Sequence, residues 1–188
     1  LSHMPRLVEG SAVSGTLLPA LAQAWGLVGE VLVAGGAGDN AASAVGMGLV
    51  RPGEGFVSLG TSGVVFVSGA AFAPNPAQAL HAFCHALPGR WHVMSVMLSA
   101  ASALTWATRN LGFADEAALL AAAATLDAGA QAQAPLFLPY LSGERSPHNN
   151  PLATGSWTGL RAAHTRAHLA YSVAEGVGFG LLDGLNTL

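Results

Sequence analysis

The sequence predicts an α/β fold, in which helices pack on a mixed sheet, and three observations support this. Apolar residues follow a helical spacing in segments such as residues 16–25 and 165–188. Beyond the turn RPGEG, residues 51–55, the spacing of apolar residues changes to two, which is typical of strands. These strand-like runs lie in pairs around short turns that contain glycine, and such pairs form hairpins. A chain that mixes these elements builds a sheet with helices against it.

The N-terminal part of the chain predicts a strand between two helices. Residues 16–25 form a helix by their spacing, and Gly26 is a suitable C-cap. Residues 31–34 are expected to be a short buried strand, and a glycine-rich turn leads from it to a helix of small residues at 40–50. Residues 5–15 are expected to be a loop.

The rest of the chain predicts two hairpins, three helices and a further strand. The first of these helices begins with a serine, which suits an N-cap, and the second has acids in its first turn, which favour its N-terminus. The expected strands are residues 56–59, 64–67, 79–87, 91–98 and 135–141; the expected helices are residues 99–111, 115–126 and 165–188; residues 142–159 are expected to be a long polar loop.

The composition excludes several classes of protein. The chain has 188 residues, of which 52% are hydrophobic and 9% charged, so it is too apolar to be disordered. All seven basic residues are arginine and the net charge is −3, which predicts no nucleic-acid surface. No uninterrupted apolar run reaches the roughly 18 residues of a membrane helix. The single Cys84 excludes a disulfide framework and suits a reducing compartment, the cytoplasm.

Both ends of the chain look cut. Residues 1–4 (LSHM) are expected to be the remnant of a cleaved expression tag. The last helical pattern stops without the usual glycine or proline signal. The chain is therefore expected to be a fragment of a larger protein.

One acid, Asp39, follows a turn that is almost free of large side chains, in the stretch VLVAGGAGDNAASAVG. The stretch is not a dinucleotide-binding turn, because Ala41 stands where the third glycine would be, and a P-loop requires a lysine that the chain lacks. The nucleophile elbow G-x-S-x-G is also absent. Asp39 is then a helix N-cap that accepts a hydrogen bond from a backbone N–H two or three residues later, or a carboxylate that a substrate approaches over glycine backbone. The two roles are compatible.

A second candidate is the stretch SLGTSG at residues 58–63. It is either an ordinary hairpin turn with glycine at positive-φ positions or an anion cradle, in which backbone N–H and hydroxyl groups meet phosphate oxygens.

Two further groups of polar residues have structural alternatives. His81, Cys84 and His85 do not converge on a metal, because strand alternation places Cys84 opposite the two histidines; packing is the preferred explanation for them and for His92. The stretch LSGERSPHNNP is expected to be exposed, and is either a solvated turn or a functional loop with a Glu144–Arg145 pair.

Together these stretches resemble the FGGY carbohydrate kinases. The resemblance is carried by VAGGAGDNAASAVG, FVSLGTSGVVFV, HAFCHALPGRWHVMSVMLSAASAL and LPYLSGERSPHNNP, and it covers the chain from about Gly15 onward. Residues 155–175 resemble the second signature of the family, with a departure at Ala174, where a larger apolar residue is usual. The stretch HAFCHALPGRWH is most similar to the branch that phosphorylates D-xylulose.

The resemblance implies an actin-like, ribonuclease H-like ATPase fold with two lobes. Residues 5–52 would be the C-terminal end of the first, sugar-binding lobe, and residues 53–188 the N-terminal part of the second, nucleotide-binding lobe. Asp39 matches the catalytic aspartate that contacts the sugar hydroxyl, and Asn40 matches a residue beside the sugar. Gly60, Thr61 and Ser62 match the turn that contacts phosphate, so the nucleotide would bind there.

The implied activity is ATP-dependent phosphorylation of D-xylulose to D-xylulose 5-phosphate, with Mg²⁺ on the nucleotide, no metal held by residues of this chain, and Asp39 as the base. The first phosphate loop and the adenine loop of the family would lie outside this chain, so the fragment is expected to be inactive alone. A homodimer is left open. Other readings also stay open: a kinase of another ketose or polyol, a non-catalytic actin-like nucleotide-binding module, or a purely structural domain.

Overall fold

The computed structural model describes residues 3–188, and the chain divides into two compact units. Unit 1 comprises Leu1–Gly55, Val67–Ala73 and Ala82–His92, and unit 2 comprises Phe56–Phe66, Pro74–His81 and Val93–Leu188. Of the expected tag remnant, residues 1 and 2 lie outside the described part of the chain. None of the helices in that part is both long and apolar enough to cross a bilayer.

A four-stranded sheet contains both expected hairpins. Its strands are β3 (Gly55–Leu59), β4 (Gly63–Gly69), β5 (His81–Cys84) and β6 (Trp91–Met97), in the order β3-β4-β6-β5. The connections within the pairs β3–β4 and β5–β6 are too short for a parallel crossover, so each pair is an antiparallel hairpin, as predicted. Strand β5 is shorter than the expected 79–87, because Ala79 has a left-handed backbone (φ 52°) after a 3₁₀ turn at Pro76–Gln78.

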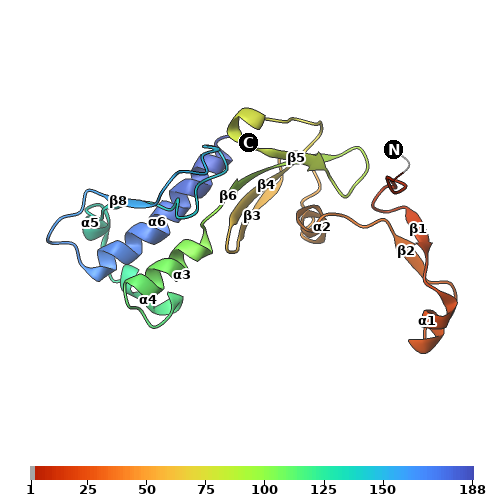
Figure 1. The fold of residues 1–188 in the computed structure, drawn as a ribbon, viewed down its shortest axis with the longest axis horizontal. Helices are drawn as coiled ribbons and strands as arrows, with labels where there is room; N and C mark the ends of the chain where they lie inside the picture. The colour runs from red at the N-terminus through yellow and green to blue at the C-terminus, as the bar shows by residue number, and fades with distance from the viewer. Residues whose placement is uncertain (1–2) are drawn as a thin grey trace. The chain divides into compact units, whose positions relative to one another are not determined.

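Unit 1 begins with a two-stranded ribbon that the sequence predicts only in part. Strand β1 (Val13–Thr16) pairs antiparallel with β2 (Leu32–Ala34), and helix α1 (Pro19–Ala24) lies in the connection between them (Figure 1). The expectation of a loop before residue 16 is therefore wrong. The expected burial of residues 31–34 is also wrong, because both strands are exposed throughout and Val31, just before β2, is only half-buried. An apolar run indicates a strand, but only the neighbouring layers decide whether it is covered.

Helix α2 (Asp39–Gly46) follows the glycine turn and is shorter than expected. It ends before residue 50 because Gly48, with φ 75°, leaves the helical conformation. Ala41 and Ala44 are its buried residues, so these two small side chains face the packed side of unit 1.

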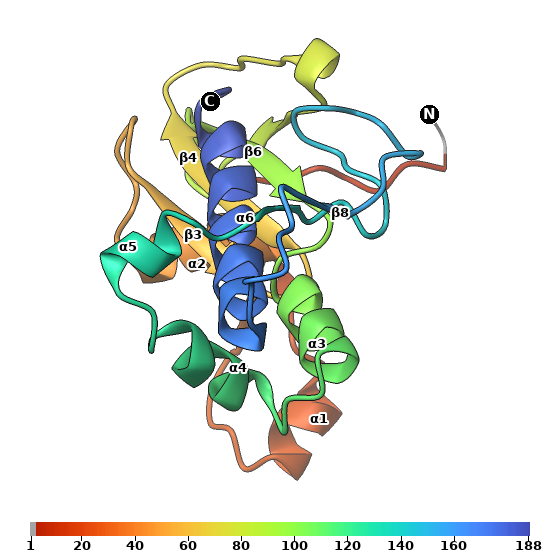
Figure 2. The same ribbon diagram turned by 90° about the vertical axis from the view of Figure 1, so that its left-hand side faces the viewer.

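The core of unit 2 is built around the long helix α6 (Arg166–Leu185). Figure 2 shows α6 among α3 (Ala101–Asn110), α4 (Glu116–Ala123) and α5 (Ala128–Gln131), and it also contacts strand β7 (Leu136–Leu138). Strand β7 pairs with β8 (Ser156–Thr158). The buried residues of this core are mostly small and apolar: Met97, Ala100, Ala103, Ala107, Leu119, Ala123, Phe137, Ala170, Val173 and Val177.

Of the two helix N-termini predicted from capping residues in unit 2, one is confirmed and one is wrong. Asp115 caps α4, since its carboxylate accepts a hydrogen bond from the Ala118 N–H at 2.7 Å. Ser99 does not cap α3, because Ala100 is the N-cap and has no side-chain capping bond. The start of α3 is held instead by the β3–β4 turn. The short helix α5 and strand β8 were not expected.

The expectation of an exposed polar loop after β7 holds for many of its residues, but it is wrong for two polar residues. Glu144 and Ser146 are each only 2% exposed. The Ser146 hydroxyl donates to the Ala79 carbonyl at 2.8 Å, and its N–H donates to the Val96 carbonyl at 3.1 Å. Polar composition predicts exposure, yet these groups are buried because other parts of unit 2 supply their hydrogen-bond partners.

The contact between α6 and β7 predicts opposite effects for two glycines on one helix. A Cβ at Gly176 would clash with the Phe137 carbonyl oxygen and lie 3.1 Å from its carbon, whereas a Cβ at Gly178 meets open space. Gly176→Ala should lower the free energy of unfolding by about 1–3 kcal/mol, and Gly178→Ala should raise it by up to about 1 kcal/mol through helix propensity. Urea unfolding of both variants measures this. Equal stability of the two variants would contradict the packing described.

Candidate functional site

Asp39 is the first residue of α2 and is exposed. The N-cap is Gly38, and Asp39 Oδ1 accepts hydrogen bonds from the N–H of Asn40 at 2.8 Å and from its side-chain Nδ2 at 3.3 Å. The expected bond from an N–H two or three residues later is therefore absent from the described contacts, and the N-cap prediction is wrong. Both bonds use Oδ1, and within the described residues Oδ2 accepts no hydrogen bond.

The glycines before Asp39 serve packing as well as access. The Gly35 N–H donates to the Ala12 carbonyl at 2.9 Å and the Gly36 N–H to the Gly10 carbonyl at 3.0 Å. A Cβ at Gly35 would lie 2.9 Å from Val8 Cγ2, and Gly36 has φ 79°. Nothing lies within 4 Å of a Cβ at Gly38, so the approach to Asp39 is open at that residue. The turn thus requires glycine for close backbone contact and for a left-handed conformation.

A cavity of about 560 Å³ lies beside this turn in unit 1. Its walls are residues 7–10, the turn at 36–38 with Ala41, and residues 84–86. Strand β5 ends at Cys84, so alternation along a strand does not extend to His85. Cys84 is exposed, and His85 is 6% exposed. The described residues hold no group of three side chains able to bind a metal.

The second expected group lies in unit 2, in the turn between β3 and β4. The Gly60 N–H donates to the Ser62 carbonyl at 3.0 Å. Neither Gly60 nor Gly63 has a positive φ, so that part of the prediction is wrong. Gly63 is required for packing instead, because a Cβ there would lie 2.9 Å from side-chain atoms of both Leu181 and Met97.

This turn is bound firmly to the start of α3 through one carbonyl oxygen. The Thr61 oxygen accepts hydrogen bonds from the Ala100 N–H at 3.0 Å and from the Ser102 hydroxyl at 2.9 Å. The Ala101 N–H donates to the Gly60 carbonyl at 3.0 Å. Thr61 is exposed, and its hydrogen bonds within the described residues all use its carbonyl, so its N–H and hydroxyl have no hydrogen-bond partner there.

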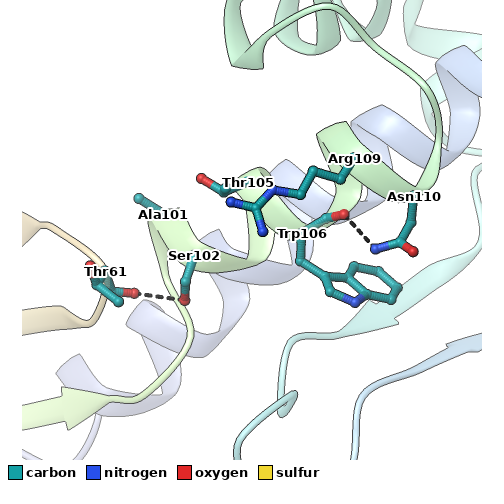
Figure 3. Close-up of a pocket in the computed structure, with 7 residues that line it drawn as sticks. All are labelled: Thr61, Ala101, Ser102, Thr105, Trp106, Arg109 and Asn110. Carbon is teal, nitrogen blue, oxygen red and sulfur yellow. Dashed lines mark hydrogen bonds between the residues drawn. The ribbon is translucent and has the colours of Figure 1, made fainter.

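An open groove of about 430 Å³ continues from Thr61 along α3 (Figure 3). Thr61 and Ser102 meet at one end, and the Arg109 guanidinium runs back along the helix toward Thr105. Its walls are Thr61, Ala101, Ser102, Thr105, Trp106, Arg109 and Asn110. The α3 residues of this groove were not among the site residues predicted from the sequence. Their three- and four-residue spacing on one helix face, directly after the turn, is the signal that could have found them.

Two charged side chains lie at this groove: Arg109 lines it, and Glu116 is hydrogen-bonded to the lining residue Thr105. The Arg109 side chain is exposed. The Thr105 hydroxyl donates to Glu116 Oε1 at 2.7 Å, and this bond lowers the pKa of the Glu116 carboxyl. The groove therefore offers a guanidinium, hydroxyl groups and an indole ring, a set of groups that suits a polar ligand with an anionic part.

The chain matches models of a known protein family along most of its length. The model of the FGGY carbohydrate kinase C-terminal domain matches residues 55–188, and that of the N-terminal domain matches residues 1–46. The chain belongs to the FGGY family of carbohydrate kinases. The expected α/β, actin-like ATPase fold is confirmed with it.

Several relatives of this FGGY chain are named xylulose kinase. The chain is 53% identical to the xylulose kinase of Escherichia coli (strain K12) over 99% of its own length and 38% of the relative. It is 54% identical to that of Klebsiella pneumoniae, over 98% of this chain and 38% of the relative. The crystal structure of a xyloylose kinase from Brucella ovis superposes with a TM-score of 0.90 at 51% identity, over 98% of this chain and 38% of that one. The chain thus spans well under half the length of these relatives.

Within the FGGY matches, the two expected groups fall in different domains. Asp39 and Asn40 lie within the residues matched by the N-terminal model, and Gly60, Thr61 and Ser62 lie within those matched by the C-terminal model. Each group is ordered by contacts inside its own unit, Asp39 by Asn40 and the turn by α3.

The buried His85–His92 pair in unit 1 predicts a pH dependence of stability. The rings lie 6.1 Å apart, and burial lowers the pKa of both, with further lowering of the pKa of His85 by Arg90 and of His92 by His85. The unfolded chain therefore binds protons more readily just below the ordinary pKa of 6.5. The free energy of unfolding should fall as the pH drops through that value. Urea unfolding of the parent and of His92→Gln tests this, and an equal slope in both would contradict it.

Proposed function

We propose that this chain is part of an ATP-dependent kinase that phosphorylates D-xylulose to D-xylulose 5-phosphate. The observation that supports it most directly is the exposed Asp39 carboxylate, which Asn40 orients through Oδ1 while Oδ2 stays available. Relatives named xylulose kinase, and the match to the FGGY models, support a sugar as the acceptor. The single Cys84, an exposed free thiol, is compatible with the reducing conditions of the cytoplasm.

In the proposed reaction Asp39 is the base for the sugar hydroxyl. Phosphoryl transfer passes through a loose transition state, so a carboxylate needs only to accept the hydroxyl proton late and to hold the oxygen in line. The Asn40 amide N–H₂ is directed to Asp39, and its carbonyl oxygen can then accept a hydrogen bond from a second sugar hydroxyl. The carboxylate and the amide together would orient one face of the ketose.

The turn at Gly60, Thr61 and Ser62 would bind the phosphates of ATP. The N–H and hydroxyl of Thr61 are available, and its carbonyl is fixed by Ala100 and Ser102. A nucleotide phosphate at Thr61 would have the groove along α3 beside it, within which Arg109 supplies positive charge. Donors that are fixed before the reaction stabilise developing charge without reorganisation.

Mg²⁺ fits this arrangement as a companion of the nucleotide. The described residues form no cluster of three metal-binding side chains, but Mg²⁺ commonly takes most of its ligands from phosphates and water. The phosphates at the Thr61 turn would hold it, and when bound it neutralises negative charge on the phosphoryl oxygens. The residues of this chain position the two substrates around it.

Replacement of Asp39 in the full-length kinase tests the assignment of the base. Asp39→Asn keeps an oxygen that accepts from Asn40 but removes the base, so kcat with D-xylulose should fall by about 10²–10⁴. Stability should change by less than about 1 kcal/mol, since an exposed acid at a helix start contributes only that much. Glu30→Gln, at another exposed carboxylate of unit 1, is the matched control and should keep full activity. Turnover of Asp39→Asn within tenfold of the parent would refute the assignment.

Turnover of a panel of ketoses and polyols by the full-length kinase identifies its substrate.

The 188-residue chain alone is proposed to be inactive, because it spans only 38% of its xylulose kinase relatives. Measurement of ATP consumption by the purified chain with and without D-xylulose should show no sugar-dependent turnover. The full-length kinase under the same conditions is the positive control. Sugar-dependent turnover by the chain alone would contradict this proposal.

A further inference from the structure

A buried carboxylate, Glu144, lies in unit 2 outside the groove and outside the residues proposed to bind substrates. It is 2% exposed, in the segment between β7 and β8. Its Oε1 accepts hydrogen bonds from the Leu98 N–H at 2.9 Å and from the Arg145 N–H at 2.7 Å. Its Oε2 is buried, with no hydrogen-bond partner in the described part of the chain.

Leu98 connects this carboxylate to the phosphate turn. It lies between the end of β6 at Met97 and the N-cap of α3 at Ala100. Its N–H donates to Glu144, and its carbonyl accepts a longer hydrogen bond, 3.4 Å, from the Ser62 hydroxyl. The peptide groups of one residue therefore join Glu144 to Ser62.

The same segment holds the other two residues of the turn. Two residues after Leu98, the Ala100 N–H donates to the Thr61 carbonyl, and the Ala101 N–H donates to the Gly60 carbonyl. A displacement of Leu98 would therefore disturb the backbone N–H groups of Ala100 and Ala101 that hold the turn to the start of α3. Within the described residues, Glu144 is the side chain that holds the Leu98 N–H.

Burial of this carboxylate is unfavourable in itself. Burial raises the pKa of Glu144, and the N–H groups of Arg145 and Leu98 lower it in part. A carboxylate accepts hydrogen bonds about twice as strongly as a neutral amide does. Burying a carboxylate with one oxygen that lacks a hydrogen bond costs folding free energy. What its charge provides at this position is a strong hydrogen bond to the Leu98 N–H.

We propose that Glu144 is a positioning residue for the phosphate turn, acting through Leu98 on Ser62 and on the start of α3. The inference rests on the proposed function, in which this turn binds the phosphates of ATP. Glu144 touches neither substrate in this proposal. Its effect is to keep the donors of the turn in place for the nucleotide.

Kinetics of the full-length kinase test the proposal with two variants and a control. Glu144→Ala removes the acceptor, and KM for ATP should rise about tenfold, while KM for D-xylulose stays within twofold. Glu144→Gln keeps an acceptor oxygen without the charge, and its KM for ATP should lie between those of the parent and Glu144→Ala.

The matched control is Ser172→Ala, which removes another buried polar group of unit 2. Ser172 is 1% exposed, and its hydroxyl accepts from Trp157 Nε1 at 2.8 Å and donates to the Leu169 carbonyl at 2.9 Å. These bonds do not involve the turn. Ser172→Ala should therefore lower the stability of the kinase but leave its KM for ATP unchanged. If Glu144→Ala and Ser172→Ala changed both KM values alike, Glu144 would be only a structural residue and the proposal would be overturned.

Amide hydrogen exchange in the 188-residue chain separates this proposal from the proposed function. Exchange at Leu98 should be at least about tenfold faster in Glu144→Gln than in the parent, and unchanged in Ser172→Ala. Unchanged exchange at Leu98 in Glu144→Gln would refute the link from Glu144 to the turn. An absence of sugar-dependent ATP turnover in the parent enzyme would instead refute the proposed function.

Discussion

The contact between the β3–β4 turn and the start of α3 is the constraint on which the arrangement of unit 2 depends. One carbonyl oxygen, that of Thr61, accepts hydrogen bonds from both Ala100 and Ser102. The turn of the first hairpin is therefore held directly against the beginning of the helix. The helix therefore needs no side-chain cap, because the turn satisfies its first N–H groups. The turn forms one end of the groove along α3, and the hydrogen bonds of Thr61 in the described residues use its carbonyl rather than its N–H or hydroxyl.

Small residues make this contact and the rest of the core possible. Ala100, the N-cap of α3, and Ala103 and Ala107 within it are fully buried, and α6 presents glycine where it meets strands and side chains. A Cβ at Gly63 would meet Leu181 and Met97, and one at Gly184 would clash with the Ser95 hydroxyl. Close approach of backbone segments gives dense packing, but it leaves little tolerance for added atoms. The high proportion of alanine and glycine in this chain thus has a direct structural cause.

Membership of the FGGY family gives the two groups of polar residues a common context. Asp39 with Asn40 and the Gly60–Ser62 turn lie in different units, and each is ordered by its own neighbours. Preorganisation within each unit means that the proposed acceptor site and the proposed phosphate site are both formed locally. The chain covers 38% of its relatives named xylulose kinase, so the complete reaction is a property proposed for the whole enzyme.

Periodicity and turn chemistry in the sequence by themselves determined the hairpins, the long helices and the motifs around Asp39 and Thr61, since these are local signals. The sequence did not determine that β1 pairs with β2, that the strand at Leu32–Ala34 is exposed, or that Glu144 is buried. It also missed the α3 side of the groove and misassigned the caps at Asp39 and Ser99. Each of these depends on what another segment places beside a residue. Only tertiary packing decides that, because burial and hydrogen-bond partners are set by segments distant in the chain rather than by the spacing of residues along it.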